Sequence, residues 1–429
     1  VRSGILDSIH AFGASTLGKP FLGFIAFCAA GSVALVVSRL DHLRSDGRLE
    51  SMFSREGAFL LNNLVLVALA FVIWWGTFFP LISEALTGQK ASVGPPWFDR
   101  YTVPLALVLV LLAGIGPVLT WRRISGRQLR RTLALPLAVA ASALVLLGVA
   151  SDAARSWTSL AMFTLIAFVV AVVGQEFWRG VGARRAMTSE PPPTALRRLV
   201  ARNRRRWGGY IVHAGISVLF LGVAASSAFH SQRDIRMSAG QTTTVGGYKV
   251  KYLRPTAVVG SDRAGTGAPI SLGAVLDVEK GGKHTIVRPQ RNFYPVNDAS
   301  VPMIARFFEG EPTSEVDVRW GLERDLWFAV QPDLASLIPA IREADRKFAN
   351  LPAQYQAQLI TAIAKSYAHN PPPANFRMIV SPMVSWIWIG GLIAVLGALT
   401  ALWPGGGDPL RRTVRSAYAA RLGRELSRA

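Results

Sequence analysis

The stretch that decides the fold carries no charge and reads GAFLLNNLVLVALAFVIWWGTFFPLIS, from Gly57 to Ser83. The hydrocarbon core of a bilayer is about 30 Å thick, and a helix needs about 20 apolar residues to cross it. The bilayer core holds no water, so the backbone of this stretch must be hydrogen-bonded within a helix. Six further uncharged stretches share this character: Phe21–Ser38, Tyr101–Trp121, Thr132–Ser151, Ser156–Gln175, Trp207–Phe229 and Pro382–Trp403. The sequence therefore predicts a polytopic α-helical membrane protein with about seven transmembrane helices.

The composition of the 429-residue chain agrees with this prediction, because 51% of its residues are hydrophobic and only 17% are charged. A mean hydropathy of +0.31 excludes a soluble globular enzyme and a disordered chain. The single cysteine, Cys28, excludes a disulfide framework and a CxxC redox pair. The first residue is Val1, and no signal pattern precedes the first apolar stretch, so we expect the chain to be part of a longer polypeptide.

Arginines are concentrated on one side of the predicted helices. Twenty-four of them fall in alternate loops and the C-terminal tail, whereas the two short loops on the other side hold Lys90, Arg100 and Arg155. Because basic loops stay in the cytoplasm, we predict a protein of the cytoplasmic (inner) membrane with its N-terminus outside. Most of the net charge of +21 is then membrane anchoring against an anionic inner leaflet, and no nucleic-acid binding is expected.

This orientation divides the chain into five parts. They are an external amphipathic segment (1–20), six transmembrane helices (21–229), an external (periplasmic-side) soluble domain (230–381), a last transmembrane helix (382–403) and a basic cytoplasmic tail (404–429). Short β-branched segments between glycine pairs predict strands in the soluble domain, at Thr242–Val245, Tyr248–Leu253, Val275–Val278 and Thr285–Val287. The apolar period becomes helical from Leu334 to Tyr367, within an insert that ends at Pro373. The domain is therefore expected to be β-rich with a helical insert, and its acidic run, Glu309–Asp317, is interpreted as a solvated face.

His213 is an ionisable residue six positions inside the stretch Trp207–Phe229, about 9 Å from its end at 1.5 Å per residue. Such residues are costly at this depth and usually face a cavity or a ligand, and imidazole is a common axial ligand of haem iron. The alternative is a neutral histidine that hydrogen-bonds across helices. The neighbours Gly208, Gly209 and Gly215 fit both interpretations, since small residues admit a close helix or a flat macrocycle.

His10 lies in the segment before the first apolar stretch. Val1, Ile5, Ile9 and Phe12 recur there at helical spacing, which favours an amphipathic helix on the outer surface. Taken alone, a histidine on such a helix is usually incidental.

Several strings, in family order across nearly the whole chain, together resemble the CcmF-type cytochrome c biogenesis proteins, the haem lyases of the bacterial cytochrome c maturation system. They are Val1-Arg2-Ser3-Gly4 through Ser8-Ile9-His10-Ala11-Phe12, Arg55-Glu56 with Leu60-Leu61-Asn62-Asn63, Gly76-Thr77 with Pro80-Leu81, Arg204-Arg205-Arg206-Trp207-Gly208-Gly209-Tyr210-Ile211-Val212-His213, and Trp386-Ile387-Trp388-Ile389-Gly390-Gly391. The resemblance covers the C-terminal part of the family. The family's Trp-rich external motif and first pair of histidines would lie upstream, in a naturally split protein or a longer one.

By this resemblance, His10 matches the second external histidine, an axial ligand of the incoming haem. His213 matches the second membrane histidine, which ligates a resident haem b together with an upstream partner. The resemblance implies part of a holocytochrome c synthase, an enzyme that receives haem from a covalent haem chaperone and attaches it to the CxxCH thiols of apocytochrome c. The implied partners are the upstream half, that chaperone, apocytochrome c with its thiol-reducing chaperone subunit, and quinol as the source of electrons for the resident haem.

Two alternatives stay open. One is a membrane transport subunit or scaffold without its own haem, which would explain the helices and the external domain but not the placement of the two histidines. The other is the paralogue dedicated to the maturation of nitrite reductase cytochromes.

Overall fold

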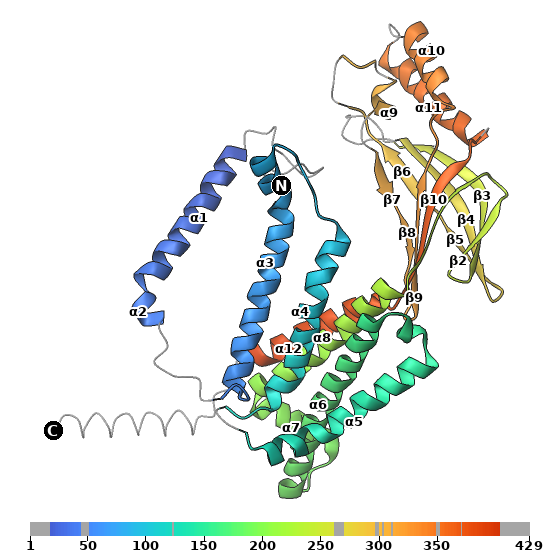
Figure 1. Cartoon of the computed structure of the whole chain (residues 1–429). Coiled ribbons are helices and arrows are strands. Elements are labelled where there is room, and N and C mark those ends of the chain that lie inside the picture. Colours follow the sequence, from blue (N-terminus) through green and yellow to red (C-terminus); the bar gives the residue numbers. More distant parts are fainter. Residues whose placement is uncertain are drawn as a thin grey trace. The chain divides into compact units, whose positions relative to one another are not determined.

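The computed structural model describes residues 18–43, 51–121, 124–260, 270–296, 300–302, 304–309, 312–348, 352–369 and 371–403 of the chain. Contacts within it define two compact units, one of residues 1–143 and 167–176 and the other of residues 144–166 and 177–429. The helices α5 (Gly126–Ala150) and α6 (Trp157–Thr188) contribute to both units (Figure 1).

Six helices in the described part of the chain are long and apolar enough to cross a membrane. They are α3 (Arg55–Thr87), α4 (Pro95–Ile115) with the 3-10 turn η1 (Gly116–Val118), α5, α6, α8 (Arg204–Ala228) and α12 (Val384–Leu402). They coincide with six of the predicted stretches and confirm a polytopic helical membrane protein. The remaining stretch, Phe21–Ser38, lies in α1 (Gly18–Ser38), and its described apolar part, Gly23–Ser38, is shorter than the other six. Short helices complete the set: α2 (Leu40–Leu43), η2 (Asp152–Arg155) and α7 (Pro192–Arg202).

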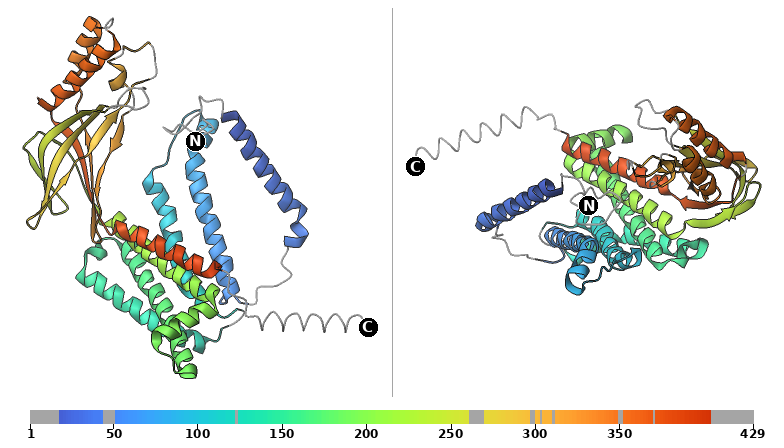
Figure 2. Two further views of the ribbon diagram at one scale, coloured as in Figure 1. Left: turned by 180° about the vertical axis from the view of Figure 1, so that it is seen from behind. Right: turned by 90° about the horizontal axis from the view of Figure 1, so that it is seen from above.

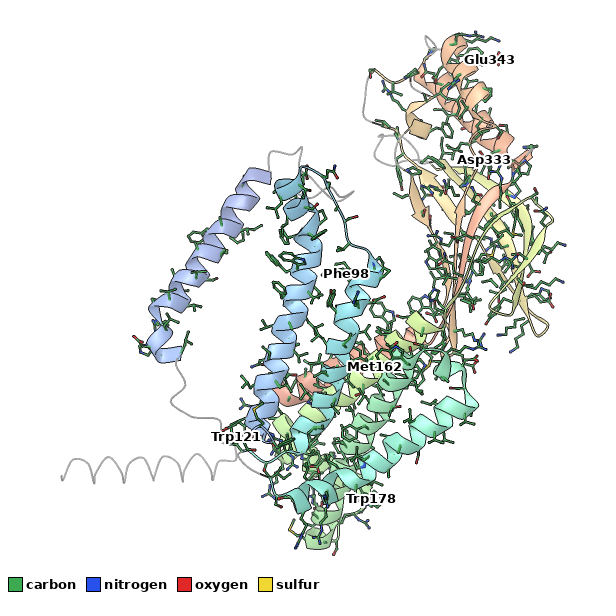
Figure 3. The ribbon with its side chains drawn as sticks, in the orientation of Figure 1. Phe98, Trp121, Met162, Trp178, Asp333 and Glu343 are labelled. Atoms are coloured by element: carbon green, nitrogen blue, oxygen red, sulfur yellow. The ribbon has the colours of Figure 1, made fainter. Side chains whose placement is uncertain are left out.

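In the first unit, α3 and α4 contact each other at two places, near the start of α3 and near Gly76. The Ser54 hydroxyl accepts a hydrogen bond from the Gly57 amide at 3.0 Å and caps the start of α3. The Arg55 guanidinium donates to the carbonyls of Gly116 and Pro117, which lie past the end of α4 where helical carbonyls lack partners. Further along, a Cβ added to Gly76 would stand 2.5 Å from the Phe98 ring, which Figure 3 shows between the two helices. The absence of a side chain at Gly76 thus allows this contact.

In the second unit, α8 and α12 lie side by side along their whole length (Figures 1 and 2). The contact is made by glycines at intervals of seven residues: Gly208, Gly215 and Gly222 on α8, and Gly390 and Gly397 on α12. A Cβ added to Gly208 would stand 2.7 Å from the Gly397 carbonyl oxygen, and one added to Gly397 would stand 2.6 Å from the Val212 amide nitrogen. Small residues at such a seam let two membrane helices pack backbone against backbone.

This seam predicts a specific effect of alanine at two adjacent glycines of α12. A Cβ at Gly390 would stand 2.6 Å from the Gly215 carbonyl oxygen, whereas one at Gly391 meets no atom within 4 Å. We expect Gly390→Ala to destabilise the protein by about 1–3 kcal/mol, the usual cost of overpacking, and Gly391→Ala to leave it unchanged. Thermal unfolding of the purified full chain in detergent measures the difference. Equal unfolding temperatures for the two variants would contradict the seam.

A domain built on two β-sheets, which we call the sheet domain, is inserted between α8 and α12. Its first strand, β1 (Ser231–Met237), follows α8, and its last, β10 (Ala374–Pro382), leads into α12. One sheet has the order β1-β10-β9-β8, with β8 (Asp317–Arg319) and β9 (Arg324–Gln331). The other has the order β2-β3-β4-β6-β7, with β5 paired to β4; its members are β2 (Thr242–Val245), β3 (Tyr248–Val259), β4 (Ile270–Lys280), β5 (Lys283–Val287), β6 (Gln290–Phe293) and β7 (Thr313–Glu315). All pairings are antiparallel.

The domain has two apolar cores. The first joins the two sheets, because alternate residues of each strand point inward, as Phe376, Met378 and Val380 do on β10. The second joins one end of β4 to the short helix α9 (Arg306–Glu309) and to the helical insert, which holds α10 (Ile338–Phe348) and α11 (Ala353–His369). The predicted strands fall within β2 to β5 and the predicted helical stretch contains α10 and most of α11, so the β-rich domain with a helical insert is confirmed.

Candidate functional site

Two exposed tryptophans on α6 have the spacing of the two faces of a bilayer. Trp157 is the first residue of α6 and Trp178 lies ten residues before its end, and they are 70% and 83% exposed. Trp178 follows Trp157 by 21 positions, which at 1.5 Å per residue is about 31 Å, the thickness of the hydrocarbon core. At the Trp157 end, Phe229 stacks on Phe163 with ring centroids 6.3 Å apart, and the sheet domain leaves the helices there. This arrangement matches the aromatic belts expected at bilayer interfaces.

His213 lies between these boundaries, about 9 Å from the Trp207 end of α8 and about 24 Å from the Phe229 end. The glycines of the seam, Gly208, Gly215 and Gly222, all face α12. With 3.6 residues per turn, His213 lies on the opposite face of α8. The sequence alone did not separate these two faces.

The His213 side chain is half-buried, and one of its ring nitrogens lacks a partner among the described residues. Its Nδ1 atom is buried and has no hydrogen-bond partner among the described residues. Its backbone carbonyl accepts a hydrogen bond of 2.8 Å from the Ser217 hydroxyl. A buried polar atom normally has a partner, and a neutral imidazole carries one nitrogen lone pair that can ligate a metal. The alternative interpretation, a histidine bonded to another helix through Nδ1, therefore finds no partner in the part of the chain that is described.

Gly209 lies one turn before His213 on the same face of α8. A Cβ added there meets no atom within 4 Å, in contrast to its neighbour Gly208, which is closed against α12. The two adjacent glycines therefore serve different purposes. Gly208 brings α12 close, and Gly209 leaves a flat, open patch beside the imidazole. A half-buried imidazole next to an open glycine surface fits a planar macrocycle with a metal at its centre.

Three aromatic rings pack together near the beginning of α8, and one of them, Phe177, is next to Trp178 in the sequence of α6. The Phe177 and Trp207 rings lie 4.8 Å apart, and the Trp207 and Tyr210 rings 5.6 Å apart. The Arg206 guanidinium stands 5.3 Å from the Trp207 ring centroid, within cation–π range. Arg206 is seven residues before His213, so both residues share one face of the helix.

The sheet domain shows polar pairs that stabilise strands rather than a set of reactive groups. Arg377 on β10 donates hydrogen bonds of 3.0 and 2.9 Å to Asp234 on β1, and these bonds lower the pKa of the Asp234 carboxyl. Burial raises the pKa of Tyr252 to about 12, which keeps this phenol protonated. No group of three or more His, Cys, Asp or Glu suited to a metal ion occurs among the described residues.

The other predicted site residue, His10, lies outside the described residues, as does the basic tail 404–429. Of the two predicted ligands, the described residues therefore include only His213. The separate roles of Gly208 and Gly209 were not predicted from the sequence. The seven-residue spacing of Gly208, Gly215 and Gly222 could have revealed the seam, because it repeats between Gly390 and Gly397.

Comparisons with known proteins give one consistent group of relatives, although no family model matches the chain. The chain is 30% identical over 404 residues to the cytochrome c-type biogenesis protein CcmF of Pseudomonas aeruginosa, covering 94% of this chain and 52% of that protein. It is 33% identical over 252 residues to the cytochrome c-type biogenesis protein CycK of Bradyrhizobium diazoefficiens, covering 58% and 37%. A solved structure, the cytochrome c haem lyase CcmF, shares the fold with a TM-score of 0.59 at 23% identity, over 91% of this chain and 51% of that one. The chain thus spans about half the length of the CcmF relatives it matches.

Proposed function

Because this chain belongs to the CcmF family of cytochrome c-type biogenesis proteins, we propose that it is a component of a cytochrome c haem lyase. The proposed reaction takes haem from a haem chaperone and attaches it covalently to the CxxCH thiols of apocytochrome c. The observation that carries the proposal in this chain is the half-buried His213, whose Nδ1 has no hydrogen-bond partner among the described residues, beside the open surface of Gly209.

In this proposal, His213 is one axial ligand of a resident haem b, and the second ligand comes from the rest of the protein. When bound, this haem supplies one-electron transfer. The residues of α8 position the ligand: the Ser217 hydroxyl binds the His213 carbonyl, and the glycine seam holds α8 against α12. Arg206 lies on the His213 face toward the nearer membrane boundary, where its guanidinium suits a carboxylate of the macrocycle.

We propose that His10 ligates the haem that is being attached, which is a substrate rather than a resident cofactor. The thiols come from apocytochrome c, since Cys28 is the only cysteine of this chain and lies in the apolar helix α1. The proposed partners are an upstream half that carries a Trp-rich motif, the haem chaperone, apocytochrome c with its thiol-reducing chaperone subunit, and quinol. The surplus of arginine at one side supports an orientation with the sheet domain outside the cytoplasmic membrane.

This orientation predicts which positions a membrane-impermeant thiol reagent reaches in intact cells. In a Cys28→Ser background, Ser261→Cys should be labelled from outside, since position 261 falls in the sequence between β3 and β4 of the sheet domain. Ser427→Cys in the tail should be labelled only after the membrane is opened. The reverse pattern would contradict the orientation, whatever the function of the protein.

A visible absorption spectrum tests the proposed function against a transport subunit or scaffold that has no haem. The chain should be purified together with the upstream half of its relatives. We expect a reduced-minus-oxidised spectrum with the α-band of a b-type haem. A preparation that folds as a membrane protein but shows no haem band would favour the scaffold.

A further inference from the structure

The turn between β8 and β9 exposes two large apolar side chains. Trp320 is 82% exposed and Leu322 is 66% exposed, and they are separated only by Gly321. Single exposed apolar residues are common on soluble surfaces. Two of them at the tip of one turn, one being tryptophan, form a local apolar patch, which we call the Trp320 turn (Trp320–Glu323).

The Trp320 turn is fixed to the beginning of the membrane helix α12. The Trp386 indole Nε1 donates a 2.8 Å hydrogen bond to the Leu322 carbonyl. The Met383 amide donates a 3.0 Å hydrogen bond to the Glu323 carbonyl. Beside the turn, the Ser385 hydroxyl donates to an Asp325 carboxylate oxygen at 3.2 Å. The turn therefore lies level with the first turn of α12, which begins at Val384.

That level coincides with a membrane boundary. Trp386 and the 76% exposed Trp388 stand in the first two turns of α12, and the apolar helix continues from there to Leu402. The boundary marked by Trp157 on α6 lies on the same side, where the sheet domain leaves the helices. Tryptophan is enriched at this depth because its ring is apolar and its N–H is polar.

Several polar backbone groups of the turn are hydrogen-bonded within the protein, as an environment with little water requires. The Gly321 amide donates a 3.0 Å hydrogen bond to Asp325, and the Leu322 and Glu323 carbonyls accept the bonds from Trp386 and Met383. Polar backbone groups cost free energy in an apolar medium unless they are hydrogen-bonded. In the Trp320 turn, the Gly321 amide and the Leu322 and Glu323 carbonyls are hydrogen-bonded in this way.

We propose that Trp320 and Leu322 insert into the interfacial layer of the bilayer on the side of the sheet domain. The turn is then a membrane-binding surface of the sheet domain, in addition to the two chain connections through β1 and β10. The occupant is lipid rather than a partner protein, because hydrogen bonds hold the turn at the depth where a spanning helix enters the bilayer. A contact at this point fixes the tilt of the sheet domain over the membrane. The proposal does not depend on haem binding.

Depth-dependent fluorescence quenching tests this proposal on the full chain in phosphatidylcholine vesicles. In a Cys28→Ser background, Trp320→Cys and Leu322→Cys each receive an environment-sensitive nitrobenzoxadiazole label. Glu343→Cys is the matched control, since Glu343 is on α10 at the far end of the domain from α12 (Figure 3). Lipids with a nitroxide near the headgroup should quench positions 320 and 322 severalfold more strongly than position 343. Iodide in the water should show the opposite order.

The second labelled position keeps the test valid if one variant folds poorly. Equal lipid quenching at 320, 322 and 343 would overturn the proposal. Protection of positions 320 and 322 from iodide without quenching by the lipid nitroxide would also overturn it, because a protein rather than the bilayer would then cover the turn.

Discussion

His10→Ala is expected to abolish the formation of holocytochrome c while leaving the b-type absorption band of the membrane protein nearly intact. In our proposal, His10 provides one nitrogen ligand to the iron of the substrate haem. A single imidazole approaches the iron from one face only, so the second ligand and an aromatic surface must come from upstream residues. Without the His10 imidazole, the substrate haem is not held in place for attachment to the thiols.

The readout is covalent haem on a reporter cytochrome c, detected after denaturing electrophoresis. The cells must lack their own haem lyase and express the variant together with the upstream half. His284→Ala is the matched control, because this exposed histidine of the sheet domain pairs with Asp277 at 3.0 Å and has no proposed role. Normal maturation with His10→Ala, or maturation by this chain without an upstream half, would overturn the assignment.

His213→Ala is expected to remove most of the b-type band. Its imidazole is the only histidine side chain that the described residues place deep within a membrane-spanning helix, and none of those residues provides a hydrogen-bond partner for its Nδ1. Loss of one axial nitrogen ligand weakens the binding of haem, and the remaining haem loses its low-spin spectrum. Maturation should fall as well, because the proposed electron supply passes through this haem.

The control for His213→Ala is His230→Ala, two residues after the end of the same helix. His230 is exposed, and its ring nitrogen lies 3.0 Å from the Ser227 carbonyl. This variant should retain the full band. The protein yields must be compared, so that loss of haem is not confused with loss of the protein. The two predictions are separable: His10→Ala affects maturation alone, whereas His213→Ala affects both the band and maturation.

The membrane helices could be predicted from the sequence because their signal is local. A run such as Gly57–Ser83 has no stable alternative to a helix in a bilayer. The sheet domain was predicted less completely. Thr242–Val245 was found with its observed ends, because β-branched residues and Gly246-Gly247 mark it. The strands β1 and β6 to β10 were missed. Of these, β1 is mostly polar, and β1 and β10 are defined by pairing with each other across more than 130 residues, as in the pair Arg236–Asn375.

The candidate site was predicted in part for a similar reason. The depth of His213 follows from its position in the sequence and from the length of the helix. Its face does not, because it depends on which glycines pack against α12. The contrast between Gly208 and Gly209, and the level of Trp320 against α12, arise from contacts between segments that are distant in the chain. No local pattern encodes them.

Ligation of a resident haem by His213 can be tested by removing its imidazole and supplying free imidazole in its place. His213→Gly leaves a cavity beside the open surface of Gly209, and free imidazole can enter it. We expect the low-spin b-type spectrum of the purified protein, with its upstream half, to be lost in this variant and to return when imidazole is added. An unchanged b-type spectrum in His213→Gly, before any imidazole is added, would contradict it.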